Sequence, residues 1–128
     1  MTAMGKGKGK GKGIILVGHG SRDPLWRAPI EAVAARLAAS QPQVATRCAY
    51  LELQQPDLPA AAAALAQLGV SEVSLVPMFL GTGKHARADL PRLLEQIRVQ
   101  YPQVAFTLQP SVGEDPRLLD LLARIALE

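Results

Sequence analysis

The 128-residue chain has few of the features that mark secreted or membrane proteins. Its single cysteine, Cys48, cannot form an intrachain disulfide, and this suits a reducing compartment. No apolar run approaches the roughly 18 residues of a membrane-spanning helix. The N-terminus also lacks the apolar core of a signal peptide. These absences predict a cytoplasmic protein that does not contact a membrane.

Aromatic residues make up only 4% of the chain, so the core must be built from aliphatic side chains. The net charge of +3 comes from four lysines in an N-terminal Gly-Lys repeat, because the rest of the chain has ten basic and eleven acidic residues. We expect residues 1–13 to form a disordered Gly-Lys tail. No aromatic interleaves its lysines, so no nucleic-acid partner is indicated. Residues 14–128 are expected to form a single α/β domain.

Familiar phosphate-binding and nucleophile motifs are also missing. The segment 18–20 lacks the third glycine of a dinucleotide fingerprint. The segment 81–85 is too short for a Walker loop and carries His85 where Ser or Thr belongs. Ser21 is not part of a Gly-x-Ser-x-Gly elbow, which makes it a poor hydrolase nucleophile. We therefore expect an ATP-independent activity and no tightly bound cofactor.

Strand and helix patterns alternate four times along the chain. Apolar runs predict strands at about 14–17, 44–51, 72–79 and 104–108. Periodic patterns that begin near prolines predict helices at about 29–40, 59–69, 89–100 and from 115 onward. In the last helix, we expect a buried stripe of Leu118, Leu121, Leu122 and Ile125. This order predicts a three-layer α/β fold, with a four-stranded parallel sheet and helices on both faces, of the flavodoxin-like kind.

Three candidate functional residues follow three successive strands. His19, Glu52 and His85 are each one βα unit apart, and both histidines are predicted to lie in glycine-rich loops. Because the carboxyl ends of parallel strands meet at one edge of a sheet, we expect the three side chains at that edge. Two imidazoles and a carboxylate suit a divalent transition metal. The alternative is that His19 is a turn histidine without a role. Glu52 would then be in place by chance, since carboxylates are common in loops.

Basic side chains flank the two histidines, namely Arg22, Arg27, Lys84 and Arg87. Arginine and lysine beside a cleft favour a ligand that carries carboxylates or phosphates. Ordinary surface charge is the alternative for any one of them.

Three motifs in this order resemble the class II chelatases. They are Leu16–Arg22, Tyr50–Leu53, and Val76–Leu80 continuing through Gly83–His85 to Asp89–Pro91. The similarity is to the short sirohydrochlorin chelatases of the CbiX type, relatives of the SirB ferrochelatases, and it spans nearly all of residues 14–128. The resemblance implies a lyase-type chelatase that inserts cobalt, or in relatives iron or nickel, into sirohydrochlorin during cobalamin or sirohaem biosynthesis.

The resemblance also implies roles for individual residues. His19, His85 and Glu52 would be the catalytic and metal-binding set. The neighbouring residues expected to bind the substrate are Ser21, Arg22, Gly81, Thr82, Gly83, Lys84 and Arg87. Short members resemble one half of longer two-unit relatives, which implies a homodimer with the macrocycle between the subunits.

This chemistry agrees with the residues. Metal insertion removes two pyrrole protons while the metal, itself a substrate, enters the ring. A neutral imidazole can accept a proton or hold the metal. Three alternatives stay open: an iron or nickel chelatase, a noncatalytic carrier of metal or tetrapyrrole, and a plain flavodoxin-like binding module.

Overall fold

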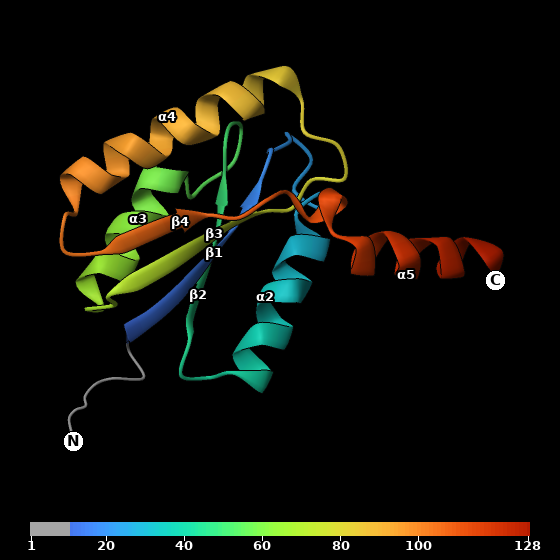
Figure 1. Ribbon diagram of the computed structural model, residues 1–128, viewed down its shortest axis with the longest axis horizontal. Coiled ribbons are helices and arrows are strands. Elements are labelled where there is room, and N and C mark those ends of the chain that lie inside the picture. Colours follow the sequence, from blue (N-terminus) through green and yellow to red (C-terminus); the bar gives the residue numbers. More distant parts are fainter. Residues whose placement is uncertain (1–10) are drawn as a thin grey trace.

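The computed structural model describes residues 11–128 and consists of one parallel sheet with helices on both faces (Figure 1). The strand order is β2-β1-β3-β4, and every neighbouring pair is parallel. The strands are β1 (Lys12–Gly18), β2 (Ala45–Tyr50), β3 (Glu72–Pro77) and β4 (Ala105–Leu108). The predicted four-stranded parallel sheet is confirmed.

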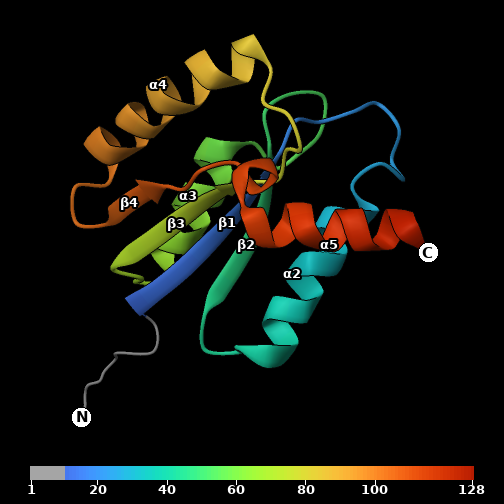
Figure 2. The same cartoon turned by 45° about the vertical axis from the view of Figure 1, so that its right-hand side comes forward.

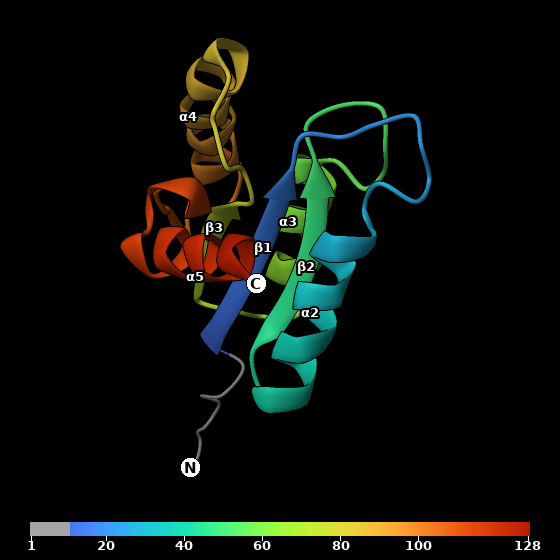
Figure 3. The ribbon, with the colours of Figure 1, turned by 90° about the vertical axis from the view of Figure 1, so that its right-hand side faces the viewer.

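The helices are α2 (Ala28–Ser40), α3 (Leu58–Gln67), α4 (Lys84–Gln100) and α5 (Pro116–Leu127), with a short 3₁₀ helix, η2 (Val112–Glu114). Helix α2 covers one face of the sheet, over β1 and β2, while α3 and α4 cover the other face (Figure 3). None of the described helices is long and apolar enough to cross a membrane.

The core is aliphatic and divided by the sheet, as the alternation of side chains along β1 requires. Ile15 and Val17 point into the larger cluster, which α3 and α4 complete. Leu16 points to the opposite face, where Ile30 and Val33 of α2 pack on it. The strand is therefore buried on both faces, and this explains its unbroken apolar run.

Two boundaries differ from the prediction. Strand β1 begins at Lys12, so the last residues assigned to the tail belong to the sheet, and residues 1–10 lie outside the described part. Helix α4 begins at Lys84, with Gly83 as its extended N-cap residue, and Pro91 lies inside the helix. The expected start near Asp89 is wrong. His85 therefore lies in the first turn of a helix and not in a loop.

The expected buried stripe of α5 is also wrong for the single chain. No residue of α5 is buried. The helix extends away from the sheet in Figures 1 and 2, and η2 is the described element with which it has its main contact. Its start is as expected, because the Asp115 side chain accepts a hydrogen bond from the backbone N–H of Arg117 (2.9 Å).

Candidate functional site

The strand order places a ligand-binding edge at the carboxyl ends of β1 and β3. The chain passes from β1 to β2 on one side, whereas β3 and β4 lie on the other side of β1. Open α/β sheets bind ligands at such a switch point, because the loops diverge there. We define the rim as the loops at this edge, residues 19–27, 51–57 and 78–83.

His19 and Glu52 lie together on the rim. The His19 Nε2 atom is 3.4 Å from the Glu52 Oε2 atom. The side chains of His19 and Glu52 are 52% and 57% exposed. The imidazole also packs edge-on against Phe79, with ring centroids 6.5 Å apart. Loops after β1, β2 and β3 thus meet at one histidine, whose polar atoms stay accessible to a ligand.

The backbone holds this pair in place. The N–H groups of Leu51 and Glu52 both donate to the carbonyl oxygen of His19, at 3.2 and 3.1 Å. Gly20 has a φ of +111°, and a Cβ atom there would lie 1.7 Å from the carbonyl oxygen of Glu52. Only glycine fits such an approach. The sequence showed a glycine after His19 but not the distant chain that it touches.

A strained turn follows Glu52. Leu53 has a φ of +66°, and the N–H of Gln54 donates to the carbonyl oxygen of Glu52 at 2.8 Å. This three-residue turn with positive φ is rare for a residue that has a side chain. The Leu53 side chain is exposed.

The third loop of the rim is fastened to the segment before α5. The N–H of Gly113 donates to the carbonyl oxygen of Phe79 at 2.9 Å, and a Cβ on Gly113 would lie 1.8 Å from the carbonyl oxygen of Leu80. Thr82 Oγ1 and Ser111 Oγ share a hydrogen bond of 2.6 Å. Ser111 and Gly113 were missed by the sequence analysis, because nothing in their local pattern indicates these contacts.

His85 is exposed in the first turn of α4. Among residues 11–128, no three His, Cys, Asp or Glu side chains come close enough to hold a metal ion. The structure thus brings His19 and Glu52 together but does not add His85 to them within one copy. The three-residue metal site stays a prediction.

The basic residues of the rim and of the first turn of α4 differ in how they are engaged. Arg27 pairs with Glu31 (3.3 Å), and Arg87 donates to the carbonyl oxygen of Thr82 (3.3 Å). Within residues 11–128, Arg22 and Lys84 form no ion pair. Both are exposed and available to an anionic ligand.

Apolar side chains also stand open on the rim. Leu25, Leu53 and Leu80 are 77%, 55% and 67% exposed. Exposed large apolar groups gathered at one edge indicate a binding surface. Phe79, in contrast, is a core residue.

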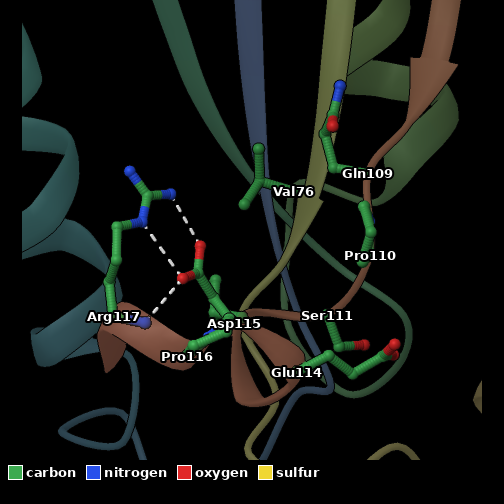
Figure 4. A pocket seen from close by; sticks show the side chains of 9 residues that line it. Val76, Gln109, Pro110, Ser111, Glu114, Asp115, Pro116 and Arg117 are labelled. Carbon is green, nitrogen blue, oxygen red and sulfur yellow. Dashed lines mark hydrogen bonds and ion pairs between the residues drawn. The ribbon is translucent and has the colours of Figure 1, made fainter. Parts of the chain in front are cut away.

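Three open pockets lie near the third loop of the rim, and the predicted substrate-binding residues Thr82 and Arg87 line one of them. Pockets of about 460, 400 and 300 Å³ lie beside β3, β4 and the start of α5. Figure 4 shows the first of them, where the Arg117 guanidinium pairs with Asp115 in front of Val76. Hydrogen bonds from Arg117 lower the pKa of Asp115 to about 2. Neither His19 nor Glu52 lines these three pockets, and both side chains are more than half exposed in the single chain.

Tyr50 supports the rim from below, at the end of β2. Its ring packs edge-on against Trp26, with centroids 6.1 Å apart, and its buried hydroxyl has no hydrogen-bond partner within residues 11–128. Burial raises the pKa of Tyr50 to about 12, and the nearby Cys48 and Glu31 act in the same direction. Burial likewise raises the pKa of the Cys48 thiol.

This pKa predicts a loss of stability in alkali. The folded protein holds the Tyr50 proton more tightly than the unfolded chain, whose tyrosines titrate near 10. The resulting stability is fully present below pH 10 and is lost as the pH rises toward about 12. Tyr50→Phe should reduce the alkaline loss to the part that the raised pKa of Cys48 contributes, and at pH 7 it should leave the free energy of unfolding unchanged or higher, because the hydroxyl has no hydrogen-bond partner within residues 11–128. Urea unfolding at pH 7 to 11 measures both effects.

Tyr101→Phe is the control variant and should keep the alkaline loss. An unchanged dependence of stability on pH in Tyr50→Phe would contradict the assignment of this loss to Tyr50.

Comparison with known proteins then decides the family. The sequence model of the CbiX family matches residues 13–128. The chain belongs to the CbiX family. This confirms the resemblance drawn from the three sequence motifs.

Two curated relatives are matched over most of their own length. The chain is 34% identical over 116 residues to the sirohydrochlorin cobaltochelatase of Methanosarcina acetivorans, covering 85% of this chain and 89% of the relative. It is 29% identical over 123 residues to the protein of the same name from Methanococcoides burtonii, covering 90% and 94%.

Solved structures confirm the fold of this CbiX chain. The CbiX protein from Marinobacter aquaeolei VT8 superposes with a TM-score of 0.78 at 30% identity, over 90% of this chain and 93% of that one. The sirohydrochlorin chelatase SirB from Bacillus subtilis subspecies spizizenii, in complex with cobalt, gives a TM-score of 0.75 at 25% identity. The match covers 88% of this chain but 48% of SirB, so this chain spans about half of that relative.

Proposed function

We propose that this protein is an enzyme that inserts Co²⁺ into sirohydrochlorin without ATP, in tetrapyrrole biosynthesis in the cytoplasm. The observation that carries the proposal is similarity over nearly the full length to curated cobaltochelatases of the same size. The exposed His19–Glu52 pair on an apolar and basic rim supports it. We propose no membrane and no nucleic acid as a partner of this protein.

The rim would hold the macrocycle by two kinds of contact. Leu25, Leu53 and Leu80 offer apolar surface to the flat ring, whose burial favours binding. The cations of Arg22, Lys84 and Arg87 would pair with the carboxylates of the ring. We propose that the macrocycle is also contacted by the other residues predicted to bind it, namely Ser21, Gly81, Thr82 and Gly83.

His19 and Glu52 would handle the protons and the metal. For each Co²⁺ that enters, two pyrrole N–H protons leave the ring. A neutral imidazole at His19 can take one of them, and the carboxylate of Glu52, 3.4 Å away, can take the other. With His85, the same pair is proposed to bind the incoming metal, because imidazole and carboxylate suit divalent transition metals.

We further propose that the enzyme works as a homodimer. One open edge can support a macrocycle from one side, and ligands of this size are normally buried over most of their surface. A second copy would supply the opposite wall, and closed two-fold dimers are the commonest homo-oligomers. The half-length match to SirB supports this arrangement.

Anaerobic insertion assays test the proposal. Purified protein is mixed with sirohydrochlorin and, in parallel, with Co²⁺, Fe²⁺ or Ni²⁺, and the absorption of the macrocycle is followed. We expect insertion faster than in protein-free controls, and fastest with Co²⁺. Faster insertion of iron or nickel would change the assigned metal, and rates equal to the protein-free controls with all three would contradict the proposal.

A further inference from the structure

The loop between β3 and α4 has few side chains of its own to hold it in place. It ends with Leu80, Gly81, Thr82 and Gly83, and a Cβ atom on either glycine would meet no atom within 4 Å. The side chain of Leu80 is exposed. Glycine loses more conformational freedom on folding than any other residue, so a loop with two open glycines needs contacts from outside. The side chain of Thr82, between the two glycines, makes such a contact.

Ser111 is the partner of Thr82, and it lies on a firmly held segment. Ser111 is only 7% exposed, and its Oγ shares a hydrogen bond of 2.6 Å with Thr82 Oγ1. The chain reaches Ser111 directly from β4 (Figure 4). The N–H of Gln109 donates to the carbonyl oxygen of Leu75 at 2.9 Å, and Pro110 restricts the backbone that follows. A buried hydroxyl without a partner costs free energy, so this hydrogen bond ties the loop to the sheet.

Both ends of the loop lead to a histidine of the proposed site. At the first end, the ring of Phe79 packs edge-on against His19, with centroids 6.5 Å apart. At the second end, Gly83 is the N-cap residue of α4, and His85 follows in the first turn of that helix. A shift of the loop at Thr82 would therefore displace groups near both histidines.

The loop has room to shift when the hydroxyl contact is lost. A pocket of about 300 Å³ lies beside it, and Thr82, Arg87 and Ser111 are among the residues that line this pocket. The carbonyl oxygen of Thr82 also accepts a hydrogen bond from Arg87, but this bond is 3.3 Å long and comes from an exposed side chain. The short bond to the buried Ser111 is the stronger of the two restraints.

We propose that Ser111 is a positioning residue for metal insertion, which acts through Thr82 and does not touch the substrate. Its hydrogen bond keeps the loop and the first turn of α4 in the geometry in which Thr82 and His85 meet the macrocycle and the metal. Displacements of about 1 Å in groups that position a substrate can slow a reaction by two orders of magnitude. This inference rests on the proposed function and adds to it a residue outside the rim.

A double-mutant cycle tests this role. Ser111→Ala should lower kcat for Co²⁺ insertion about tenfold and raise the KM for sirohydrochlorin, at temperatures where circular dichroism shows the variant to be folded. Thr82→Val keeps the shape of the side chain and loses the hydroxyl, so adding Ser111→Ala to it should have no further effect. Ser74→Ala on β3 is the matched control and should leave both constants unchanged. Effects of Ser111→Ala and Thr82→Val that multiply would overturn the role.

Hydrogen exchange tests the same contact without substrate. The N–H groups of Gly113 and Arg87 donate to the carbonyl oxygens of Phe79 and Gly83, at 2.9 and 3.0 Å. Both groups should exchange faster in Ser111→Ala than in the wild type, because the loop that accepts their hydrogen bonds is loosened, whereas the N–H groups of β2 should keep their rates. Unchanged exchange at both groups would overturn the inference at any level of activity.

The possible outcomes separate the two proposals. Thr82→Val alone should show the same faster exchange, and this comparison decides the case even if Ser111→Ala proves too unstable to assay. An active wild type with an equally active Ser111→Ala variant would overturn only the positioning role. A wild type that inserts no metal would contradict the proposed function itself.

Discussion

His19→Ala should reduce cobalt insertion by at least about 100-fold, the usual contribution of a positioned acid–base group, and leave the fold intact. The side chain is half exposed and its contacts are with Glu52 and Phe79, so its removal opens no cavity in the core. His85→Ala should have a similar effect, because the exposed His85 is proposed to bind the incoming metal from the first turn of α4. Initial rates under anaerobic conditions and thermal unfolding measure the two properties separately.

Gln100→Ala is the matched control for these variants. Gln100 is exposed at the opposite end of α4, so both rate and stability should stay at the wild-type level. Glu52→Gln keeps the shape of the side chain but loses its charge, and it should slow insertion as well. Full activity in His19→Ala or in His85→Ala would remove that histidine from the proposed mechanism.

Gly20→Ala should have the largest effect on stability. The new methyl group would meet the carbonyl oxygen of Glu52 at 1.7 Å, and φ is +111°, where a side chain is strained in any surroundings. We expect the free energy of unfolding to fall by about 3 kcal/mol. Insertion should fall too, because the backbone contact that holds Glu52 beside His19 is displaced.

Gly81→Ala is the stability control for Gly20→Ala. A Cβ at Gly81 meets nothing within 4 Å, so we expect a change below about 0.5 kcal/mol. Urea unfolding of both variants gives the comparison. Equal urea midpoints for Gly20→Ala and the wild type would contradict this expectation. They would show that the loops after β1 and β2 can move apart without lowering the free energy of unfolding.

The layers of this fold could be predicted from the sequence because they follow from local patterns. The unbroken run before Gly18 indicates a strand buried on both faces, and the alternation of strands and helices indicates a parallel sheet. The placement of His19 and Glu52 at one edge follows from that topology. Their distance of 3.4 Å does not, because it depends on the close approach of Gly20 to Glu52, two segments far apart in the chain.

The start of α4 was mispredicted although the signal was present. Asp89 and Pro91 look like a helix start, since an acidic residue and a proline favour the first turn. However, Ala86, Leu90, Leu94 and Ile97 form one buried stripe at helical spacing, and it begins before the proline. Packing of this stripe on the sheet outweighs the local preference of Pro91.

The error at α5 has a different physical origin. The period of its leucines correctly indicates an apolar face, but periodicity does not say which surface will cover that face. In the single chain this face is covered only in part, with Leu118 and Leu122 half-buried and no residue of α5 fully buried.

Counting turnovers is the most direct test of whether this CbiX chain is an enzyme. Purified protein is supplied with a large molar excess of sirohydrochlorin and Co²⁺ without oxygen, and the cobalt-containing macrocycle formed per protein molecule is measured. The account predicts many insertions per molecule, at a rate above that of the protein-free mixture. Formation that stops at one macrocycle per protein or per dimer would identify a carrier and contradict the account.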